Sequence, residues 1–380
     1  MLTLTEEQKL VVDEVERLAR NEFEPNAFTW EGEEYPQENI DLLASQGFLG
    51  LNLPTEYGGG GMSEFAVALE IETVGRICPD TAAAIYGQSM VAPRAIEMFG
   101  SDAAKEYYLP KVIDGEISIA IAISEPEAGS DSRNMNTAVS EANDGELYLN
   151  GEKTWVSNVP DSAAAVVWAK FPEGLGTVIM EFDQPGVEIE QHHTNMYGGT
   201  QTQFYMEDVH IPNDRVLVRG KDALKQQLFA LNWERCGSSM YANSIALNAF
   251  DKAVAYAQDR VQFNQPIADF QGIQWKLAEM ATAIESSRML TYRAAINAHN
   301  RGEPPSRLES SLAKLHSSRT VENVVSEALQ IHGANGYQQG HPLEYMYRLA
   351  RGRRLAAGTD EIQLNNVADE VLKNGLSRTI

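Results

Sequence analysis

The sequence is poor in cysteine and has no long apolar run. Only two cysteines occur, Cys78 and Cys236, which excludes a disulfide scaffold and leaves too few thiols for a cysteine-rich metal site. The seven histidines do not recur at ligand spacing, so we expect no metal. No stretch approaches the roughly 20 apolar residues of a membrane span, and the acidic start MLTLTEEQ lacks the plan of a signal peptide. We therefore expect a cytoplasmic protein with no membrane partner.

Positive charge is also scarce. The chain has 54 acidic and 30 basic residues, a formal net charge of −24, and only 11 of the basic residues are lysine. A nucleic-acid partner needs a positive footprint, so this class of partner is excluded. An acidic, lysine-poor surface suits a salt-rich cytoplasm, because screening relieves its self-repulsion. This halophile-like surface is a hypothesis about habitat.

The 380 residues, 43% of them hydrophobic, have room for two or three domains. A capping box, TEEQ at 5–8, opens a helical pattern that continues over residues 1–115. Short β-type runs follow in 116–220, and apolar spacings of three, four and seven return in 221–380. The pattern predicts an α+β multidomain chain: an N-terminal α-helical domain, a middle β-barrel or sandwich domain, and a C-terminal four-helix bundle.

Glycine-containing turns divide the elements further. Asp144-Gly145 and Asn150-Gly151 are both dipeptides that favour tight hairpins in the middle domain. The run GGGG at 58–61 is not followed by Gly-Lys-Ser/Thr, so we expect a flexible turn rather than a phosphate-binding loop.

Two neighbouring segments could hold a flat, polar ligand. AISEPEAGSDS (122–132) gathers Ser124, Ser130 and backbone N–H groups in one loop, although such a loop by itself is most often an ordinary turn. In KTWVSN (153–158), strand alternation would present Trp155 and Ser157 on one face. An aromatic plate beside a hydroxyl suits an aromatic ligand, and the alternative is a tryptophan in a sandwich core beside a surface serine.

These segments, taken with others in the same order, resemble the acyl-CoA dehydrogenase family of flavoproteins over essentially the whole chain. The matching stretches are LPTEYGGGGMS, AISEPEAGSD, KTWVSN, RVQFNQPIADFQGIQWKLAEMA (260–281), QIHGANGY (330–337) and AAGTDEIQ (356–363). The resemblance implies the acyl-CoA dehydrogenase fold, bound FAD, an acyl-CoA substrate of fatty-acid or amino-acid catabolism, and an electron-transfer flavoprotein as acceptor. It also implies a homo-oligomer, usually a tetramer, because neighbouring subunits share the cofactor site in this family.

The resemblance also assigns cofactor contacts. It places the pyrimidine side of FAD at the backbone of Ile121 and Ile123 and at Ser124, the isoalloxazine against Trp155, and N5 near Ser157. Ser130 would contact the flavin or the CoA side of the cleft. The remaining implied FAD contacts are Arg260, Phe263, Phe270, Gln271, Gln330, Gly333, Ala334, Thr359 and Glu361. A guanidinium such as that of Arg260 matches pyrophosphate oxygens, but an arginine at a helix end can also merely complement the helix dipole.

Dehydrogenation needs a carboxylate that removes the proton next to the thioester. Many family members carry it directly before the final Gly-Thr, where this chain has Ala357. A minority, including isovaleryl-CoA dehydrogenases, carries it on the first long C-terminal helix, and the matching residue in ALNWERCGSS is Glu234. An arbitrary Glu-Arg pair is usually a surface feature, but the alanine at 357 favours Glu234 as the base.

Around that base the resemblance implies substrate contacts. Asn232, Arg235, Ser130 and Gly358 would touch the acyl-CoA, and Ala357 would offer its backbone N–H to the thioester oxygen. Two rival functions remain open. One is an enoyl-CoA reductase of the crotonobetainyl-CoA reductase type, which uses the same groups in reverse. The other is a protein that binds FAD without acyl-CoA turnover, in a repair, scaffold or lyase role.

Overall fold

A computed structural model describes residues 3–376 of the chain. In chain order, helices come first, eight strands follow, and helices return. This order confirms the predicted fold class of a helical, a β and a second helical region. Contacts divide the chain into two compact units, one of Met1–Glu31, Glu64–Ala83 and Arg235–Ile380 and the other of Gly32–Ser63 and Ala84–Glu234. The bounds of the three domains expected from the sequence stay a prediction.

The first unit is helical. Its helices are α1 (Glu6–Leu18), the π-helical turn Ala19–Phe23, α3 (Glu64–Gly75), the start of α4 (Pro79–Met90), most of α7 (Ala223–Asp259), α8 (Gln271–Arg301), α9 (Arg307–His332), α10 (Pro342–Arg353) and α11 (Asp360–Asn374). A two-stranded ribbon of β9 (Val261–Gln262) and β10 (Gln265–Pro266) lies between α7 and α8 in the chain. The capping box expected at Thr5 is present and opens α1.

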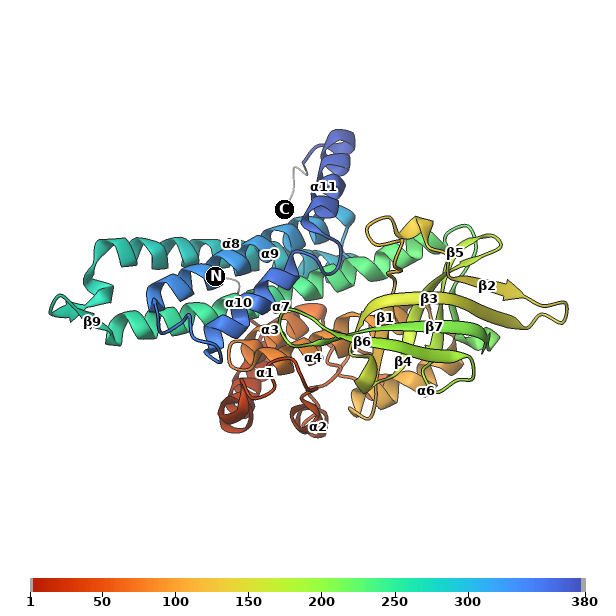
Figure 1. Cartoon of the computed structure of the whole chain (residues 1–380), viewed down its shortest axis with the longest axis horizontal. Coiled ribbons are helices and arrows are strands. Elements are labelled where there is room, and N and C mark those ends of the chain that lie inside the picture. Colours follow the sequence, from red (N-terminus) through yellow and green to blue (C-terminus); the bar gives the residue numbers. More distant parts are fainter. Residues whose placement is uncertain (1–2, 377–380) are drawn as a thin grey trace. The chain divides into compact units, whose positions relative to one another are not determined.

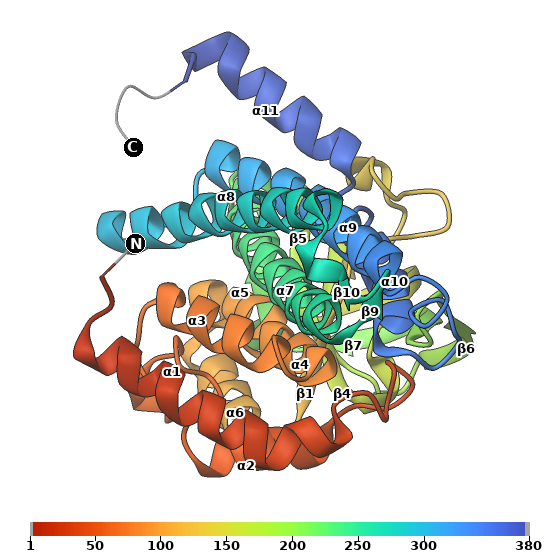
Figure 2. The ribbon, with the colours of Figure 1, turned by 90° about the vertical axis from the view of Figure 1, so that its left-hand side faces the viewer.

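Helix α9 is the element on which the C-terminal helices pack. It contacts α8, α10 and α11, and Figures 1 and 2 both show α8 and α9 side by side. Polar groups join α7 to α8, because Asn243 accepts from the Ser287 hydroxyl at 2.5 Å and donates to that of Thr291 at 3.2 Å. Buried amide-hydroxyl pairs of this kind fix the register between two helices, since an unpaired partner would be costly.

The second unit carries the sheet. Its helices are α2 (Gln37–Ser45), the end of α4, α5 (Ala92–Phe99), α6 (Asp102–Ile113) and the first turns of α7. Its strands are β1 (Ser118–Ala122), β2 (Ala138–Glu141), β3 (Leu147–Ser157), β4 (Ser162–Phe171), β5 (Gly174–Glu181), β6 (Val187–Thr194), β7 (Thr200–Ile211) and β8 (Val216–Val218). They form one sheet in the order β6-β7-β3-β2-β4-β5-β8, with β1 parallel to β4.

Strand β4 is buried on both faces. Ala165, Val167 and Ala169 join side chains of β3 and β7 in one core cluster, while Ala164 and Val166 pack with α5 and α6. Figure 1 shows α6 beside this part of the sheet. A strand covered on both faces has no polar side, which explains why the run AAAVVWA is almost entirely apolar. None of the helices in residues 3–376 combines the length and apolar composition that crossing a membrane would take.

The prediction of a hairpin is confirmed at Asp144-Gly145 and is wrong at Asn150-Gly151. Strands β2 and β3 pair through the turn at Asp144-Gly145, where Gly145 has φ 88°. Asn150-Gly151, by contrast, lies inside β3. The Asn150 side chain accepts from the backbone N–H of Asp208 on β7 and donates to the Asp208 carboxylate. These two bonds keep β3 paired with β7 where the turn was expected. The glycine is needed because the backbone of Thr137 passes close to it.

The expectation of a flexible GGGG turn is also wrong. The N–H groups of Gly59, Gly60 and Gly61 donate to the carbonyl oxygens of Pro54, Gly50 and Leu53. A Cβ on Gly59 would lie 2.3 Å from the Leu53 carbonyl oxygen. The glycines therefore allow two backbone segments to pack directly on each other, which is a closely packed turn.

Gly151 and Gly174 form a matched pair for testing this reading of β3. Both have an extreme positive φ, 143° and 141°, but an added Cβ meets Thr137 Oγ1 at 2.5 Å at Gly151 and nothing within 4 Å at Gly174. We expect Gly151→Ala to lower the free energy of unfolding by about 3–5 kcal/mol, from backbone strain and steric overlap together. Gly174→Ala should cost only about 1–3 kcal/mol, from strain alone. Urea unfolding measures both, and equal losses would contradict the close approach.

The start of α9 depends on Glu309. It completes a capping box with Ser306 and also accepts hydrogen bonds from Arg301 and Asn297 of α8. Burial by itself raises the pKa of Glu309, but these bonds outweigh burial and lower the pKa to about 2. A carboxylate with a lowered folded-state pKa stabilises the fold above its unfolded pKa, and this stability is lost as the pH falls through the folded pKa.

Glu309→Gln keeps a side chain that can complete the capping box and removes only the charge. At pH 7 we expect the variant to be about 1.5–3 kcal/mol less stable than the original chain, the usual value for hydrogen bonds to a charged group. The difference should shrink as the pH falls from about 4.5 toward 2, because the original carboxylate then becomes protonated. Urea unfolding at pH 7, 4 and 3 measures it, and a pH-independent difference would contradict the assignment.

Candidate active site

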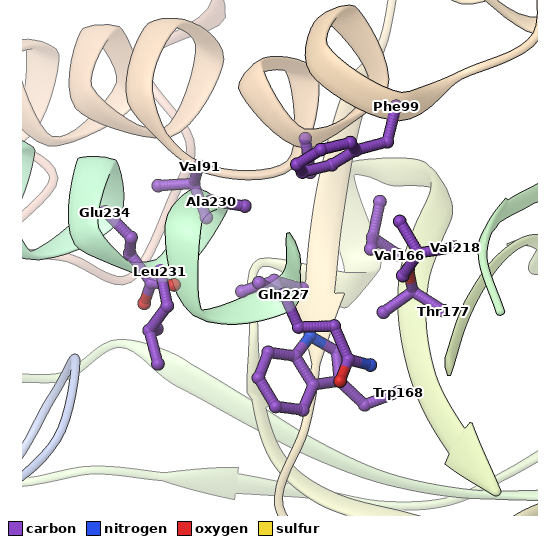
Figure 3. A pocket seen from close by; sticks show the side chains of 12 residues that line it. Val91, Phe99, Val166, Trp168, Thr177, Val218, Gln227, Ala230, Leu231 and Glu234 are labelled. Carbon is purple, nitrogen blue, oxygen red and sulfur yellow. The ribbon is translucent and has the colours of Figure 1, made fainter. Parts of the chain in front are cut away.

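A mostly apolar pocket lies within the second unit (Figure 3). Its walls come from the end of α4, from α5, from strands β1, β4, β5 and β8, and from the first turns of α7. The lining residues are Val91, Ala95, Phe99, Ile121, Val166, Trp168, Thr177, Val218, Gln227, Ala230, Leu231 and Glu234. A concave apolar pocket with few polar groups is the usual form of a small-molecule site.

Glu234 is one of the polar groups of this pocket. It is 8% exposed, so the surface alternative for this residue is wrong. Its neighbour Trp233 is buried, with the Arg94 guanidinium 5.2 Å from the centre of the ring. This contact fixes the rotation of α7 at the point where the carboxylate enters the pocket wall. A carboxylate held in an apolar wall is what proton abstraction from a bound ligand needs.

Gln227 and Thr177 are the other polar side chains of the lining. Gln227 lies seven residues before Glu234, two turns earlier on the same face of α7. Its side-chain N–H donates to the carbonyl oxygen of Gly176 at 2.7 Å. Thr177 is the next residue of β5 and is also buried. Figure 3 shows Gln227 and Glu234 projecting from one helix.

The loop expected to hold a flat ligand begins where β1 leaves the pocket wall. Ile121 lines the pocket, and Ile123 and Ser124 follow it directly. The carbonyl oxygen of Ser124 accepts from the N–H of Thr154 at 3.0 Å. The structure therefore brings the two expected segments together, since Thr154 immediately precedes Trp155. Ser130 lies further along the same loop and is exposed.

A buried ion pair fixes this arrangement. The Lys153 ammonium is fully buried and donates to the carbonyl oxygen of Ile123 at 3.0 Å and to the Glu125 carboxylate at 2.9 Å. Glu125 also accepts from the backbone N–H groups of Asn136 and Thr137, at 2.5 and 2.9 Å. The bonds of Lys153 tie the loop to the strand that carries Trp155, and those from Asn136 and Thr137 tie it to the segment before β2.

The pKa values of this pair follow from its burial. Burial lowers the pKa of Lys153 to about 8, although the Glu125 carboxylate opposes the shift. Burial by itself raises the pKa of Glu125, but the hydrogen bonds from Asn136, Thr137 and Lys153 outweigh it and hold the pKa below its usual value. Glu125 is therefore ionised at neutral pH, as its three donors require.

Trp155 is 55% exposed, which excludes the alternative of a tryptophan in the sandwich core. Trp155 and Ser157 are both exposed with the buried Val156 between them, as the alternation predicts. Before Trp155 the alternation breaks, since Lys153 and Thr154 are both buried and the pairing with β7 shifts register. Trp155 itself has φ 60°, and its ring lies 5.1 Å from that of His193. A strained backbone and an exposed indole are typical of a residue placed for a ligand.

In the first unit, the turn between α10 and α11 holds the other expected catalytic position. Ala357 and Gly358 both have left-handed φ, 55° and 87°. The Gln363 side chain donates to the carbonyl oxygens of both residues, at 3.2 and 3.0 Å. Among the described residues, the bonds that fix this turn use carbonyl oxygens of Ala357 and Gly358, and the Ala357 N–H is not one of their donors.

The turn leads into α11 through Thr359, whose side chain caps the helix by accepting from the N–H of Ile362. Glu361 is exposed, whereas Asp360 is turned inward. Its carboxylate accepts from Ser318 at 2.8 Å, Arg354 at 2.8 Å and Arg319 at 3.2 Å, and Lys314 lies at 3.7 Å. Burial raises the pKa of Asp360, but these groups outweigh it and lower the pKa. Asp360 therefore joins the turn to Ser318 and Arg319 of α9 and to Arg354.

Two of the expected substrate contacts lie together in this unit. Arg235 is buried, and a Cβ on Gly358 would lie 4.0 Å from its Nη2 atom. The guanidinium of Arg235 is thus next to the turn that carries Ala357. Asn232, in the second unit, is buried one turn before Arg235 on the same helix.

The expected cofactor contacts after α7 form an exposed hairpin. Arg260 follows the last residue of α7, and Phe263 and Asn264 form the tip of the β9-β10 ribbon, both with left-handed φ. Asparagine tolerates this conformation better than most residues, which suits Asn264 to the hairpin tip. Phe263 is 88% exposed and meets the ring of Phe270 edge-on. Gln271 begins α8 and is exposed.

The second expected pyrophosphate segment lies beside the first. His332, at the end of α9, stacks on Tyr256 with 4.2 Å between ring centres, and Tyr256 is one turn before Arg260 on α7. Asn335 also donates to the Tyr256 hydroxyl at 2.8 Å. The structure therefore brings Gln330, Gly333 and Ala334, all of them exposed, close to the end of α7.

Four residues of the site were not found from the sequence. Lys153 and Glu125 stand inside the two quoted motifs, but only the ligand-facing members of those motifs were considered. Gln227 could have been found from its spacing of seven before Glu234, which places both on one helix face. Thr177 carries no such signal, because it is one of several threonines in β-type runs.

Family models match nearly the whole chain. The acyl-CoA dehydrogenase N-terminal domain matches residues 5–116, the middle domain matches 120–209, and the C-terminal domain matches 224–372. A similar curated protein is the acryloyl-CoA reductase (NADH) of Anaerotignum propionicum, 34% identical over 98% of this chain and 96% of its own length. The probable acyl-CoA dehydrogenase YngJ of Bacillus subtilis is 33% identical over 97% and 99%. A 3-sulfinopropanoyl-CoA desulfinase of Paraburkholderia xenovorans is 33% identical over 100% and 99%.

Solved structures agree with this result. Butyryl-CoA dehydrogenase from Megasphaera elsdenii superposes with a TM-score of 0.92 at 27% identity, over 98% of this chain and 100% of that one. A chain from work on the electron transferring flavoprotein of Acidaminococcus fermentans also gives 0.92, at 28% identity over 98% and 100%. An acyl-CoA dehydrogenase complexed with FAD from Bacillus anthracis gives 0.89 at 28% identity, over 98% of this chain and 68% of that one.

The Lys153–Glu125 pair predicts a specific pattern of stability. Lys153→Met leaves a buried carboxylate without its main cation and should cost about 3–5 kcal/mol of unfolding free energy. The double variant K153M/E125Q should lose clearly less, because no charge remains buried and the amide oxygen still accepts from Thr137. Lys170→Met is the control, because Lys170 is partly exposed near the end of β4, and it should change stability by no more than about 0.5 kcal/mol. Additive losses in urea unfolding would show that the two side chains do not act as a pair.

Proposed function

Since the chain belongs to the acyl-CoA dehydrogenase family, a family of oxidoreductases, we propose that it binds FAD and converts an acyl-CoA thioester to the trans-2-enoyl-CoA. The observation that carries this proposal is the position of Glu234. It is the one carboxylate among the residues that line the pocket, and the alternative position 357 holds an alanine. A reaction that begins with removal of an α-proton needs such a base.

The residues present fit FAD. Trp155 offers an exposed indole face, Ser157 an exposed hydroxyl beside it, and the loop through Ile123 and Ser124 is fixed next to them by Lys153. An aromatic plate with adjacent hydrogen-bonding groups suits a flat heteroaromatic ring. The exposed Arg260 suits a pyrophosphate, because its guanidinium can bond two oxygens at once. When bound, FAD supplies the acceptor for the hydride from the β-carbon.

In the proposed reaction, Glu234 takes the α-proton as the double bond forms between the α- and β-carbons. The apolar lining excludes water from the carboxylate, which strengthens its interaction with the substrate. Ala357 contributes its backbone N–H to the thioester oxygen and so stabilises the charge that develops there. Gln363 and Asp360 hold the turn that aims this N–H, and Arg235 binds on the CoA side.

We propose an electron-transfer flavoprotein as the acceptor that regenerates the oxidised cofactor. The similarity to a chain from work on the electron transferring flavoprotein of Acidaminococcus fermentans supports this. We further propose a homo-oligomer, because Phe263 at the hairpin tip is exposed, as are Gln330, Gly333 and Ala334, although all of them match cofactor contacts in the family. Phe263 would then reach the cofactor of a neighbouring subunit.

The second candidate function is reduction of an enoyl-CoA. The same base and cofactor serve both directions, and the similar protein of Anaerotignum propionicum is an acryloyl-CoA reductase. A third candidate is a lyase role without net redox change; one similar protein is a 3-sulfinopropanoyl-CoA desulfinase. The three differ in what they do to the cofactor.

Anaerobic mixing of the FAD-loaded protein with a panel of acyl-CoA thioesters separates these candidates. A dehydrogenase bleaches the flavin absorbance, and we expect Glu234→Gln to slow bleaching by at least about 10³-fold while FAD stays bound, because the α-proton then has no acceptor. Glu207→Gln, an exposed carboxylate on β7, is the matched control and should bleach at the original rate.

Other outcomes are equally informative. Chemically reduced protein that enoyl-CoA reoxidises, with no bleaching by acyl-CoA, supports the reductase. A flavin that no thioester bleaches and no enoyl-CoA reoxidises sinks both redox proposals. Bleaching that survives in Glu234→Gln would reject Glu234 as the base.

A further inference from the structure

The amide of Gln227 is fixed in one orientation. Its Nε2 donates to the carbonyl oxygen of Gly176 at 2.7 Å, and only the nitrogen of the amide can do this. Oε1 is therefore an acceptor. Within residues 3–376 this atom is buried and has no hydrogen-bond partner, although the side chain is only 2% exposed. A buried acceptor without a donor is unfavourable, so a donor from a ligand would be strongly bound there.

The surroundings restrict what that ligand can be. Besides Gln227, Thr177 and Glu234, every lining residue is apolar, and none of the twelve is basic. Figure 3 shows apolar side chains such as Phe99 and Val166 around the interior. A terminal carboxylate or other anion would face the Gln227 oxygen and the Glu234 carboxylate with no cation in the wall. A neutral or cationic donor has no such conflict.

The spacing on α7 sets the length of the ligand. Seven residues separate Gln227 from Glu234, which corresponds to about 10.5 Å along the helix axis. One hydrogen-bond length at the amide and one approach distance at the carboxylate take up about 3 Å each. The remainder of about 4.5 Å spans three to four bonds, so about two or three atoms lie between the carbon that Glu234 deprotonates and the donor atom.

We propose that the pocket takes a short acyl-CoA thioester whose far end carries an O–H or N–H donor, and that Gln227 Oε1 accepts from this group. Gln227 is thus a specificity-determining residue. Thr177, which follows Gly176 on β5, is a second polar group close to it. The inference rests on the proposed function in one respect, because Glu234 is taken to mark the α-carbon end.

Matched pairs of thioesters test the proposal. In 4-hydroxybutanoyl-CoA and 5-hydroxypentanoyl-CoA a hydroxyl replaces the terminal methyl of pentanoyl-CoA and hexanoyl-CoA. Titration calorimetry on the FAD-loaded Glu234→Gln protein gives the dissociation constants without turnover. We expect one of the hydroxyl members to bind about tenfold more tightly than its methyl partner. Glutaryl-CoA, whose far end is anionic, should bind more weakly than 5-hydroxypentanoyl-CoA and hexanoyl-CoA.

Variants assign the preference to one atom. Gln227→Leu in the same background has a similar volume but no acceptor, and should reverse the preference so that the methyl member binds more tightly. Leu231→Val is the control, because it enlarges the pocket slightly at an apolar position of the same helix. It should change the affinities for the hydroxyl and the methyl member by the same factor. The preference of the Glu234→Gln protein is itself a test that does not require Gln227→Leu to fold.

Failure of this inference and failure of the proposed function are distinguishable. Equal affinities within each pair, or a preference for the methyl member, overturn the inference whether or not any thioester bleaches the flavin. A hydroxyl preference that Gln227→Leu leaves unchanged also overturns it. A hydroxyl preference that Gln227→Leu abolishes or reverses supports it, even if the original chain then proves to be no dehydrogenase.

Discussion

The contact between Lys153 and Glu125 is the constraint on which the second unit's site depends. An ammonium group without exposure is costly, and it is tolerated because a carboxylate and the carbonyl oxygen of Ile123 both accept from it. The same carboxylate bonds two backbone N–H groups of the next segment. One side chain thereby fixes the loop after β1, the strand β3 and the connection to β2. The exposed Trp155 has its position because it follows Thr154, which bonds the loop at Ser124, and Lys153, which is held in the ion pair.

The pocket follows from the way that β4 is covered. Because helices pack on one face of this strand and the folded sheet on the other, its side chains alternate between two interiors. Val166 and Trp168 point from the strand into the pocket lining, where α5 and the first turns of α7 complete the wall. Apolar packing on all sides leaves Glu234, Gln227 and Thr177 as the polar groups of the lining, so these three determine what chemistry it can support.

The C-terminal turn is built by similar means in the first unit. Asp360 collects donors from α9 and from Arg354, while Gln363 binds the carbonyl oxygens of Ala357 and Gly358. These contacts hold two consecutive residues in a left-handed conformation. The turn therefore keeps its shape with an alanine at 357, since the bonds that define it involve the backbone and not the side chain at that position. Loss of a carboxylate there is compatible with retention of the backbone donor.

The order of helical and β regions, the capping box at Thr5, the family and the proposed base Glu234 could all be predicted from the sequence. Periodicity, short-range capping and motif order are local properties, which is why they could be predicted. The strand through Asn150-Gly151 and the close packing of the GGGG run could not, because Asp208, Thr137 and Leu53 are distant in the chain. For the same reason, the burial of Lys153 could not be predicted, nor could the position of Gln227 Oε1, which is buried and finds no donor within residues 3–376. A residue's partners across the fold set whether a polar group is satisfied, and no spacing in the sequence records them.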